Sequence, residues 1–218
     1  MLQIGCSGFP VPATRYLREF MLEEVADTHL GVPGPALVRR WRRESPEGFL
    51  FTALAPRELT AEGFRRTSAT DTAWDGFLPV VRELSARSVV VVSPPDLAVG
   101  KASRAAVRAF FEALAPRELP ALVWEPPPTW EIKEAESAVR ELGVLVARDP
   151  LRHPPFGKVA RGYYRLNGPA GHKSRYEDPA IELIAEVVNA TQSSETLLVF
   201  ANVDMYADAK RLRRSVER

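Results

Sequence analysis

The sequence predicts a compact α/β barrel of the (β/α)8 type, built on a parallel sheet. Three observations support this fold: eight short runs with the composition of β-strands, helical patterns between most of them, and a length of 218 residues. Eight units in this length give about 27 residues each, near the lower end for the fold. A single domain over residues 1–218 is therefore expected.

The predicted strands are short and rich in apolar and β-branched residues. In the run Val89-Val90-Val91-Val92 the apolar residues are continuous, which is typical of a strand covered on both faces of a parallel sheet. The eight runs are Leu2–Cys6, Glu24–Val32, Phe49–Ala55, Ser88–Ser93, Ala121–Glu125, Val144–Arg148, Gly162–Asn167 and Leu197–Asn202.

Helical periodicity separates most of these strands. Apolar residues recur at spacings of three and four, as in Val107, Phe110, Phe111 and Leu114. The predicted helices are Pro35–Arg43, Asp71–Ser85, Lys101–Leu114, Ile132–Leu142, Pro179–Asn189 and Ala207–Val216. The stretch Pro150–Lys158 is too short and too rich in proline for a full helix.

Composition excludes several classes of protein. The formal charge is +1, so a dedicated nucleic-acid coat is not expected, and the two basic runs, Arg39–Arg43 and Lys210–Arg214, are predicted to be solvated helix faces. A single cysteine, Cys6, excludes an internal disulfide and a multi-cysteine metal site. Without an apolar run of about 18 residues or a basic leader, we expect a soluble cytoplasmic protein with no membrane partner. The oligomeric state carries no sequence signal.

Several motifs occur in a fixed order along nearly the whole chain. They are Ile4-Gly5-Cys6-Ser7-Gly8-Phe9, Pro94-Pro95, Trp124-Glu125-Pro126 with Trp130, Tyr163-Tyr164-Arg165-Leu166-Asn167-Gly168 and Phe200-Ala201-Asn202. This ordered set resembles the YecE-like proteins, the domain-of-unknown-function family 72. The resemblance implies a TIM-like barrel, in a family whose activity is not established as a whole.

The resemblance also implies a set of polar residues at the barrel mouth. The positions that match the family are Glu24, Thr28, Arg57, Glu125, Trp130, Asp149, Tyr163, Arg165, Tyr176 and Asn202. Six other positions depart from the family pattern: Ala26, Leu54, Val92, Pro127, Asn167 and Ala201. Many of these departures replace polar groups with apolar ones, so either the ligand differs or an ancestral activity has been lost.

Strand alternation predicts a buried ion pair. Tyr163, Arg165 and Asn167 share one side of their strand, and Glu24 shares a side with Thr28 if the second run is extended throughout. If these sides face inward, an unpaired charge would cost several kcal/mol, so Arg165 should pair with Glu24 or Glu125. The pair is either structural or holds Arg165 ready for an anion.

The segment Gly168–Tyr176 is a second candidate for anion binding. Its two glycines are expected to leave backbone N–H groups available to an oxyanion, while His172, Lys173 and Arg175 supply positive charge. Loops after the seventh and eighth strands often bind phosphate in this fold. A solvated basic loop is the alternative interpretation.

Metal and thiol chemistry have weak support. Three dispersed histidines, His29, His153 and His172, are too few for a multi-metal cluster, and no metal or other cofactor is expected. A single-metal site from His29 with Glu24 or Asp149 is disfavoured because strand alternation points His29 away from Glu24. Cys6 has no evident activating partner and is interpreted as a small buried residue.

We therefore predict a protein that binds a small phosphorylated or carboxylated anion at the carboxyl-terminal mouth of the barrel. The ligand-binding residues would be Glu24, Thr28, Tyr163, Asn167, Gly168, Lys173, Tyr176 and Asn202. In an alternative enzyme, a hydrolase, a lyase or a phosphodiesterase resembling barrel nucleases, Arg165 would clamp the anion and Glu125 or Asp149 would act as general base. A non-catalytic interaction protein on a degenerate barrel is a third hypothesis.

Overall fold

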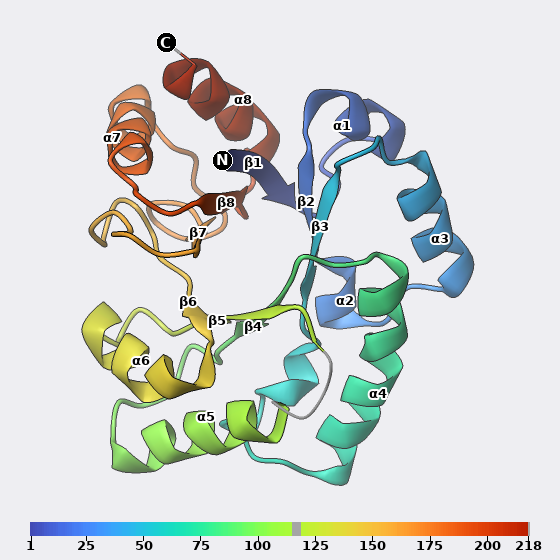
Figure 1. Ribbon diagram of the computed structural model, residues 1–218, viewed down its shortest axis with the longest axis vertical. Coiled ribbons are helices and arrows are strands. Elements are labelled where there is room, and N and C mark those ends of the chain that lie inside the picture. Colours follow the sequence, from blue (N-terminus) through green and yellow to red (C-terminus); the bar gives the residue numbers. More distant parts are fainter. Residues whose placement is uncertain (115–118, 218) are drawn as a thin grey trace. The chain divides into compact units, whose positions relative to one another are not determined.

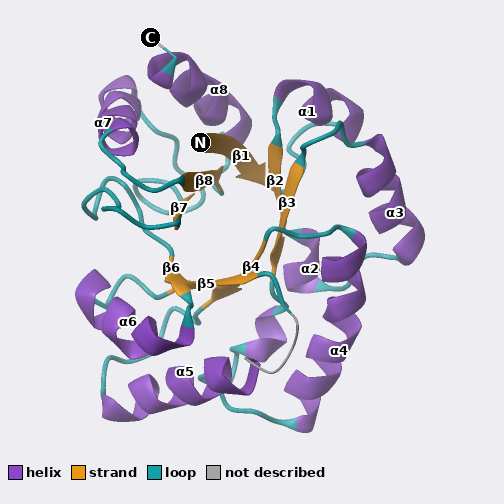
Figure 2. Cartoon of the chain, viewed as in Figure 1, coloured by secondary structure: helices purple, strands orange, loops and turns teal. Residues whose placement is uncertain are grey.

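The computed structural model describes residues 1–114 and 119–217, and their contacts form two compact units. Strands and helices alternate along the chain (Figures 1 and 2). The first unit comprises Met1–Glu24, Pro46–Leu50 and Ala147–Arg218, and the second comprises Val25–Ser45 and Phe51–Val146. Each unit has its own run of parallel strands.

In the first unit the strands follow the order β2, β1, β8, β7. Their bounds are β1 Leu2–Ser7, β2 Leu22–Val25, β7 Arg161–Leu166 and β8 Glu195–Phe200, where β2 contributes all but its last residue to this unit. Strands β1 and β8 pair in parallel from Leu2 opposite Thr196 to Cys6 opposite Phe200, which confirms the predicted pairing of the first and last strands. The helices are α1 Ala13–Glu19, α7 Asp178–Asn189 and α8 Met205–Val216, and α7 and α8 pack side by side (Figure 1).

In the second unit the strands follow the order β3, β4, β5, β6. They are β3 Leu50–Leu54, whose first residue belongs to the other unit, β4 Ser88–Val92, β5 Ala121–Glu125 and β6 Leu145–Val146. The helices are α2 Asp27–Leu30, α3 Pro35–Glu44, α4 Ser68–Glu83, α5 Lys101–Leu114 and α6 Ile132–Val139, with 3-10 turns η1 Arg57–Leu59 and η2 Arg140–Leu142. Val89, Val90 and Val91 of β4 are fully buried, as the continuous apolar run predicts, and Val92 at the end of the strand is half-buried.

The predicted second strand is too long. Strand β2 ends at Val25, and the chain turns into α2, whose Thr28 hydroxyl donates to the carbonyl oxygens of Val25 at 2.7 Å and Leu54 at 2.5 Å. Local hydrogen bonding of this kind competes with a strand ladder. Thr28 is therefore buried in a helical turn, and the expected alternation of Glu24 with Thr28 is wrong.

Helix α1 is missing from the sequence-based prediction. It has seven residues and buries only Tyr16 and Leu17, so it shows little periodicity. The Tyr16 hydroxyl accepts from the Cys6 N–H and donates to the Leu22 carbonyl, both at 2.7 Å. Tyr16 thus connects the backbones of β1 and β2. The sixth strand is also shorter than predicted, but an isolated parallel bridge joins Arg148 to Tyr164 beyond it.

The close approach of β1 to β2 requires a glycine at position 5. A Cβ atom there would lie 2.2 Å from the Leu22 carbonyl oxygen, which is backbone and cannot swing away. We expect Gly5→Ala to reduce the free energy of unfolding by about 1–3 kcal/mol, the usual cost of overpacking. The control is Gly31→Ala, where no atom lies within 4 Å of the added methyl group. Equal denaturation midpoints for the two variants would contradict the prediction.

Candidate functional site

A network of four side chains lies in the first unit, contributed by β1, β2 and β7. The Glu24 carboxylate accepts from the Ser7 hydroxyl at 2.6 Å and from the Tyr163 hydroxyl at 2.8 Å. The Arg165 Nε–H group donates to both oxygens of Glu24, at 3.0 and 3.2 Å. Three donors from two other strands therefore converge on one carboxylate.

Burial makes this ion pair necessary. The Glu24 side chain is 0% exposed and the Arg165 side chain 9% exposed, so each charge would carry a large desolvation cost without the other. The predicted pairing of Arg165 with a carboxylate is confirmed, with Glu24 as the partner. Glu125 belongs to the second unit, where it ends β5 and is half-buried.

Asn167 extends the network to the exposed end of β7. Its Oδ1 atom accepts from the Arg165 NH1 group at 2.6 Å, and its side chain lies where the chain is exposed to solvent. Tyr163, Arg165 and Asn167 therefore share one side of the strand, as alternation predicts. The guanidinium is held at Nε by a buried carboxylate and at NH1 by an exposed amide.

Asp149 follows the bridge between Arg148 and Tyr164, and the Arg165 N–H donates to the Arg148 carbonyl at 3.0 Å. The Asp149 carboxylate accepts from the Leu151 N–H at 2.9 Å. Burial raises the pKa of Asp149 above its ordinary value, and the nearby charges of Arg152 and His153 only partly offset this. Asp149 thus lies in the chain one residue beyond Arg148, whose backbone bonds to that of Arg165.

Tyr176 is close enough to Asp149 for the charge of Asp149 to act on the Tyr176 hydroxyl. Burial raises the pKa of the Tyr176 hydroxyl, and the negative charge of Asp149 raises it further. The hydroxyl accepts from the Gly168 N–H at 2.8 Å, and the ring packs edge-on against Phe200 at 5.7 Å. Tyr176 therefore stays protonated and fixes the start of the loop after β7.

The glycines of that loop do not present their N–H groups to an oxyanion as expected. The Gly168 N–H is taken by Tyr176, and the Gly171 N–H donates to the Gly168 carbonyl at 3.2 Å. Both glycines have left-handed φ angles, +91° and +92°, which close the loop on itself. Lys173 is exposed, and Arg175 lies 3.8 Å from Glu177, so the positive charge of the loop is on its outside.

Asn202 also hydrogen-bonds to the loop after β7. It is fully buried, and its amide group donates to the Ser174 carbonyl at 3.0 Å and to Asp208 at 2.8 Å. Asp208 in turn accepts from Arg211 at 2.9 Å. These contacts make Asn202, two residues beyond the end of β8, an anchor of the loop.

Sequence reasoning missed Ser7, Asp208 and Arg211. Ser7 is part of the motif at the end of the first strand and would face the same side of that strand as Gly5, which is a weak signal. Asp208 and Arg211 lie three residues apart on α8, a spacing that allows contact, but the basic run there was interpreted as a solvated face.

The histidines and the cysteine have structural contacts. The His29 Nδ1 atom lies 2.8 Å from the Ala55 carbonyl, the His153 Nδ1 atom accepts from the Asp149 N–H, and the His172 Nδ1 atom lies 2.7 Å from the Ala201 carbonyl. Within residues 1–114 and 119–217, no three His, Cys, Asp or Glu side chains gather as a metal-binding group. Burial raises the pKa of the Cys6 thiol to about 12, which confirms Cys6 as a buried residue rather than a reactive thiolate.

Residues 13–218 match the family model described as protein of unknown function DUF72. The chain belongs to the DUF72 family. The resemblance inferred from the ordered motifs is thus confirmed. A search of curated proteins finds no match to this DUF72 protein.

Solved structures show the fold of this DUF72 protein. A DUF72 family protein from Enterococcus faecalis has a TM-score of 0.78 at 16% identity, over 100% of this chain and 98% of that chain. A xylose isomerase domain containing protein from Salmonella typhimurium has a TM-score of 0.65 at 13% identity, over 99% of this chain and 96% of that chain. Endonuclease IV from Thermus thermophilus has a TM-score of 0.57 at 14% identity, over 98% of this chain and 97% of that chain. These similarities establish the predicted TIM-like (β/α)8 barrel. Among the described residues, no helix is both long and apolar enough to cross a bilayer.

The buried ion pair predicts a large effect of removing the Glu24 charge. We expect Glu24→Gln to lower the free energy of unfolding by about 3–5 kcal/mol, because it leaves the Arg165 cation buried without compensation. The control is Glu195→Gln. Glu195 lies 3.2 Å from Arg161, whose side chain is 37% exposed, so this change should cost no more than about 1 kcal/mol. Urea denaturation measures both, and equal losses would refute the role of burial.

The raised pKa of Asp149 predicts a pH-dependent gain in stability. When the folded-state pKa of an acid lies above the unfolded value, its ionised form destabilises the fold at neutral pH, and this penalty disappears as pH falls through the folded pKa. Asp149→Asn should therefore raise the melting temperature at pH 7, with a gain that shrinks toward pH 4. The exposed Asp96, changed to Asn, is the control. A gain that grows at low pH would contradict the assignment.

Proposed function

We propose that this DUF72 protein binds a small carboxylated or phosphorylated anion at the carboxyl end of β7, with Arg165 as the principal contact. The observation that carries the proposal is the fixed guanidinium of Arg165. Glu24 holds its Nε edge inside the unit, while its NH1 group reaches Asn167 at the solvent-exposed strand end. A planar guanidinium held in one orientation is the group best suited to bind carboxylate or phosphate.

The surroundings of Arg165 in the first unit support an anion. The loops after β6 and β7 carry Arg148, Arg152, Lys173 and Arg175, whereas their acidic groups are Asp149 and Glu177. Arg152 and Lys173 are exposed. Basic side chains therefore outnumber acidic ones in these two loops, which favours the approach of an anion.

Catalysis is the second candidate function, and Asp149 is the observation that favours it. A carboxyl group with a raised pKa is better suited to transfer protons near neutral pH than an ordinary aspartate. Asp149 would then act as general acid or base on an anion held by Arg165, in a hydrolase or lyase. The similarity to endonuclease IV concerns the fold, so it does not favour a phosphodiesterase over these.

Binding of sulfate or phosphate tests the proposal. At about 100 times its dissociation constant, an anion that binds only the folded state adds about 2.7 kcal/mol to the free energy of unfolding. We expect millimolar phosphate to raise the melting temperature above that in sodium chloride of equal ionic strength. Asn167→Asp, which sets a carboxylate beside the Arg165 NH1 group and leaves Glu24 in place, should abolish the shift.

The matched control is Asn189→Asp, the same change at the exposed last residue of α7. It should retain the phosphate shift. If phosphate has no effect on the unchanged protein, or if both variants respond alike, the Arg165 site does not bind anions. A screen of phosphate esters on the same preparation separates binding from turnover, and Asp149→Asn should remove any turnover found.

A further inference from the structure

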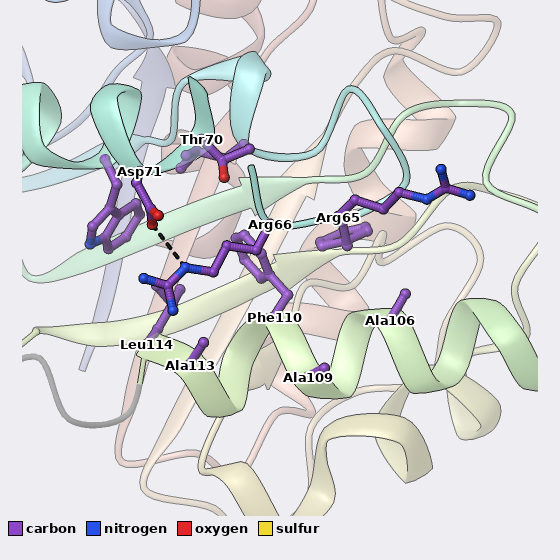
Figure 3. Close-up of a pocket in the computed structure, with 12 residues that line it drawn as sticks. Arg65, Arg66, Thr70, Asp71, Ala106, Ala109, Phe110, Ala113 and Leu114 are labelled. Carbon is purple, nitrogen blue, oxygen red and sulfur yellow. Dashed lines mark hydrogen bonds and ion pairs between the residues drawn. The ribbon is translucent and has the colours of Figure 1, made fainter. Parts of the chain in front are cut away.

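A cavity of about 540 Å³ lies within the second unit, and none of the residues that line it belongs to the proposed anion site. It is open to solvent and bordered by the segment after η1, the first turns of α4 and one face of α5 (Figure 3). This volume falls in the range of small-molecule sites, about 300–1,000 Å³. Neither the anion proposal nor the family motifs account for it.

Buried aromatic rings form the walls of the cavity. Phe64, Trp74 and Phe110 all line it, and each is less than a tenth exposed. Phe64 packs edge-on against Phe110 with ring centroids 5.1 Å apart. Its φ angle is +68°, which costs a non-glycine residue about 1–2 kcal/mol and directs its ring into the aromatic cluster. The walls are therefore held in place before any ligand arrives.

Small side chains keep the cavity open on the side of α5. Ala106, Ala109 and Ala113 recur at spacings of three and four, so they share one helix face, and Figure 3 shows them directed toward the cavity. Ala109 is exposed to solvent. A larger residue at this position would occupy the space that the alanine leaves.

Two arginines lie at the rim, and only one of them is neutralised. The Arg66 Nε–H group donates to Asp71 at 2.9 Å. Arg65 is exposed and, within the part of the chain that the structure describes, makes no ion pair or hydrogen bond with its side chain. Figure 3 shows the two guanidinium groups over opposite ends of the α5 face. The cavity therefore has apolar walls and one uncompensated positive charge.

We infer that this cavity binds a small amphipathic anion with an apolar body and a single carboxylate group. The body would lie between the aromatic walls and the alanines of α5, where it removes apolar surface from water. The carboxylate would pair with Arg65 at the rim. One free cation fits a single negative charge, which distinguishes this ligand from a multiply charged phosphate ester.

Fluorescence titration with anilinonaphthalene sulfonate, an aromatic monoanion, tests the inference. The folded protein should bind the probe in a saturable way, and decanoate should displace it, whereas decanol should do so less well and inorganic phosphate not at all. Ala109→Phe should abolish binding by filling the cavity. Ala105→Phe is the matched control, because it adds the same ring to an exposed position of α5 that does not line the cavity.

A second pair of variants tests the charge. Arg65→Gln should weaken decanoate binding about tenfold while changing decanol binding little. The exposed Arg39 of α3, changed to Gln, should alter neither. Probe binding that survives Ala109→Phe, or is lost equally in Ala105→Phe, would overturn the inference. A dimer that Ala109→Phe dissociates, with no probe bound, would assign the cavity to a second copy of the chain and also overturn it.

Discussion

The buried carboxylate of Glu24 imposes the strongest constraint on the first unit. A carboxylate with no exposed surface must be matched by donors, and the chain supplies them from Ser7, Tyr163 and Arg165. Residues at alternate positions of a strand face the same side, so a slip of one residue in β7 would turn Tyr163 and Arg165 to the other face together. The ion pair therefore specifies one register among the alternatives, whatever its net contribution to stability.

The same constraint gives the mouth of the first unit its rigidity. Arg165 cannot leave Glu24 without stranding two charges, so its outer group stays beside Asn167. The loop that follows is fixed from two directions, by the Tyr176 hydroxyl at its first glycine and by the Asn202 amide at Ser174. A ligand that meets such a preorganised group loses less binding energy to ordering of the protein.

The fold was largely predictable, because periodicity and the order of the motifs report on how strands and helices are buried. Helix α5 and strand β5 have the predicted bounds, since their apolar residues face one continuous core. The second strand is shorter than predicted, although Thr28 continues the alternating pattern of the sequence. In the structure the Thr28 hydroxyl donates to the Val25 carbonyl, so the chain turns there instead of extending the strand. For Arg165, strand alternation leaves two possible partners, Glu24 and Glu125. The contact of Ser7 with Glu24 could not be predicted, because it depends on the register that sets Ser7 of β1 opposite Glu24 of β2. The cavity had no sequence signal, because its lining depends on the left-handed turn at Phe64.

The positions at which this chain departs from the pattern that the resemblance implies bear on the choice between binding and catalysis. In the first unit, among the residues that the resemblance implies for the site, Glu24 contacts Tyr163 and Arg165, and Asp149 acts on Tyr176. In the second unit, Leu54, Val92 and Pro127 lie at or just beyond strand ends where the resemblance implies polar groups, and Leu54 and Pro127 are buried. Binding an anion requires one oriented cation, which the first unit supplies by itself. Acid–base chemistry usually needs two proton-transfer groups of different pKa, and of the two proposed general bases the first unit contains Asp149 alone. The chemistry of the site therefore favours a ligand held at Arg165 over a reaction carried out on it.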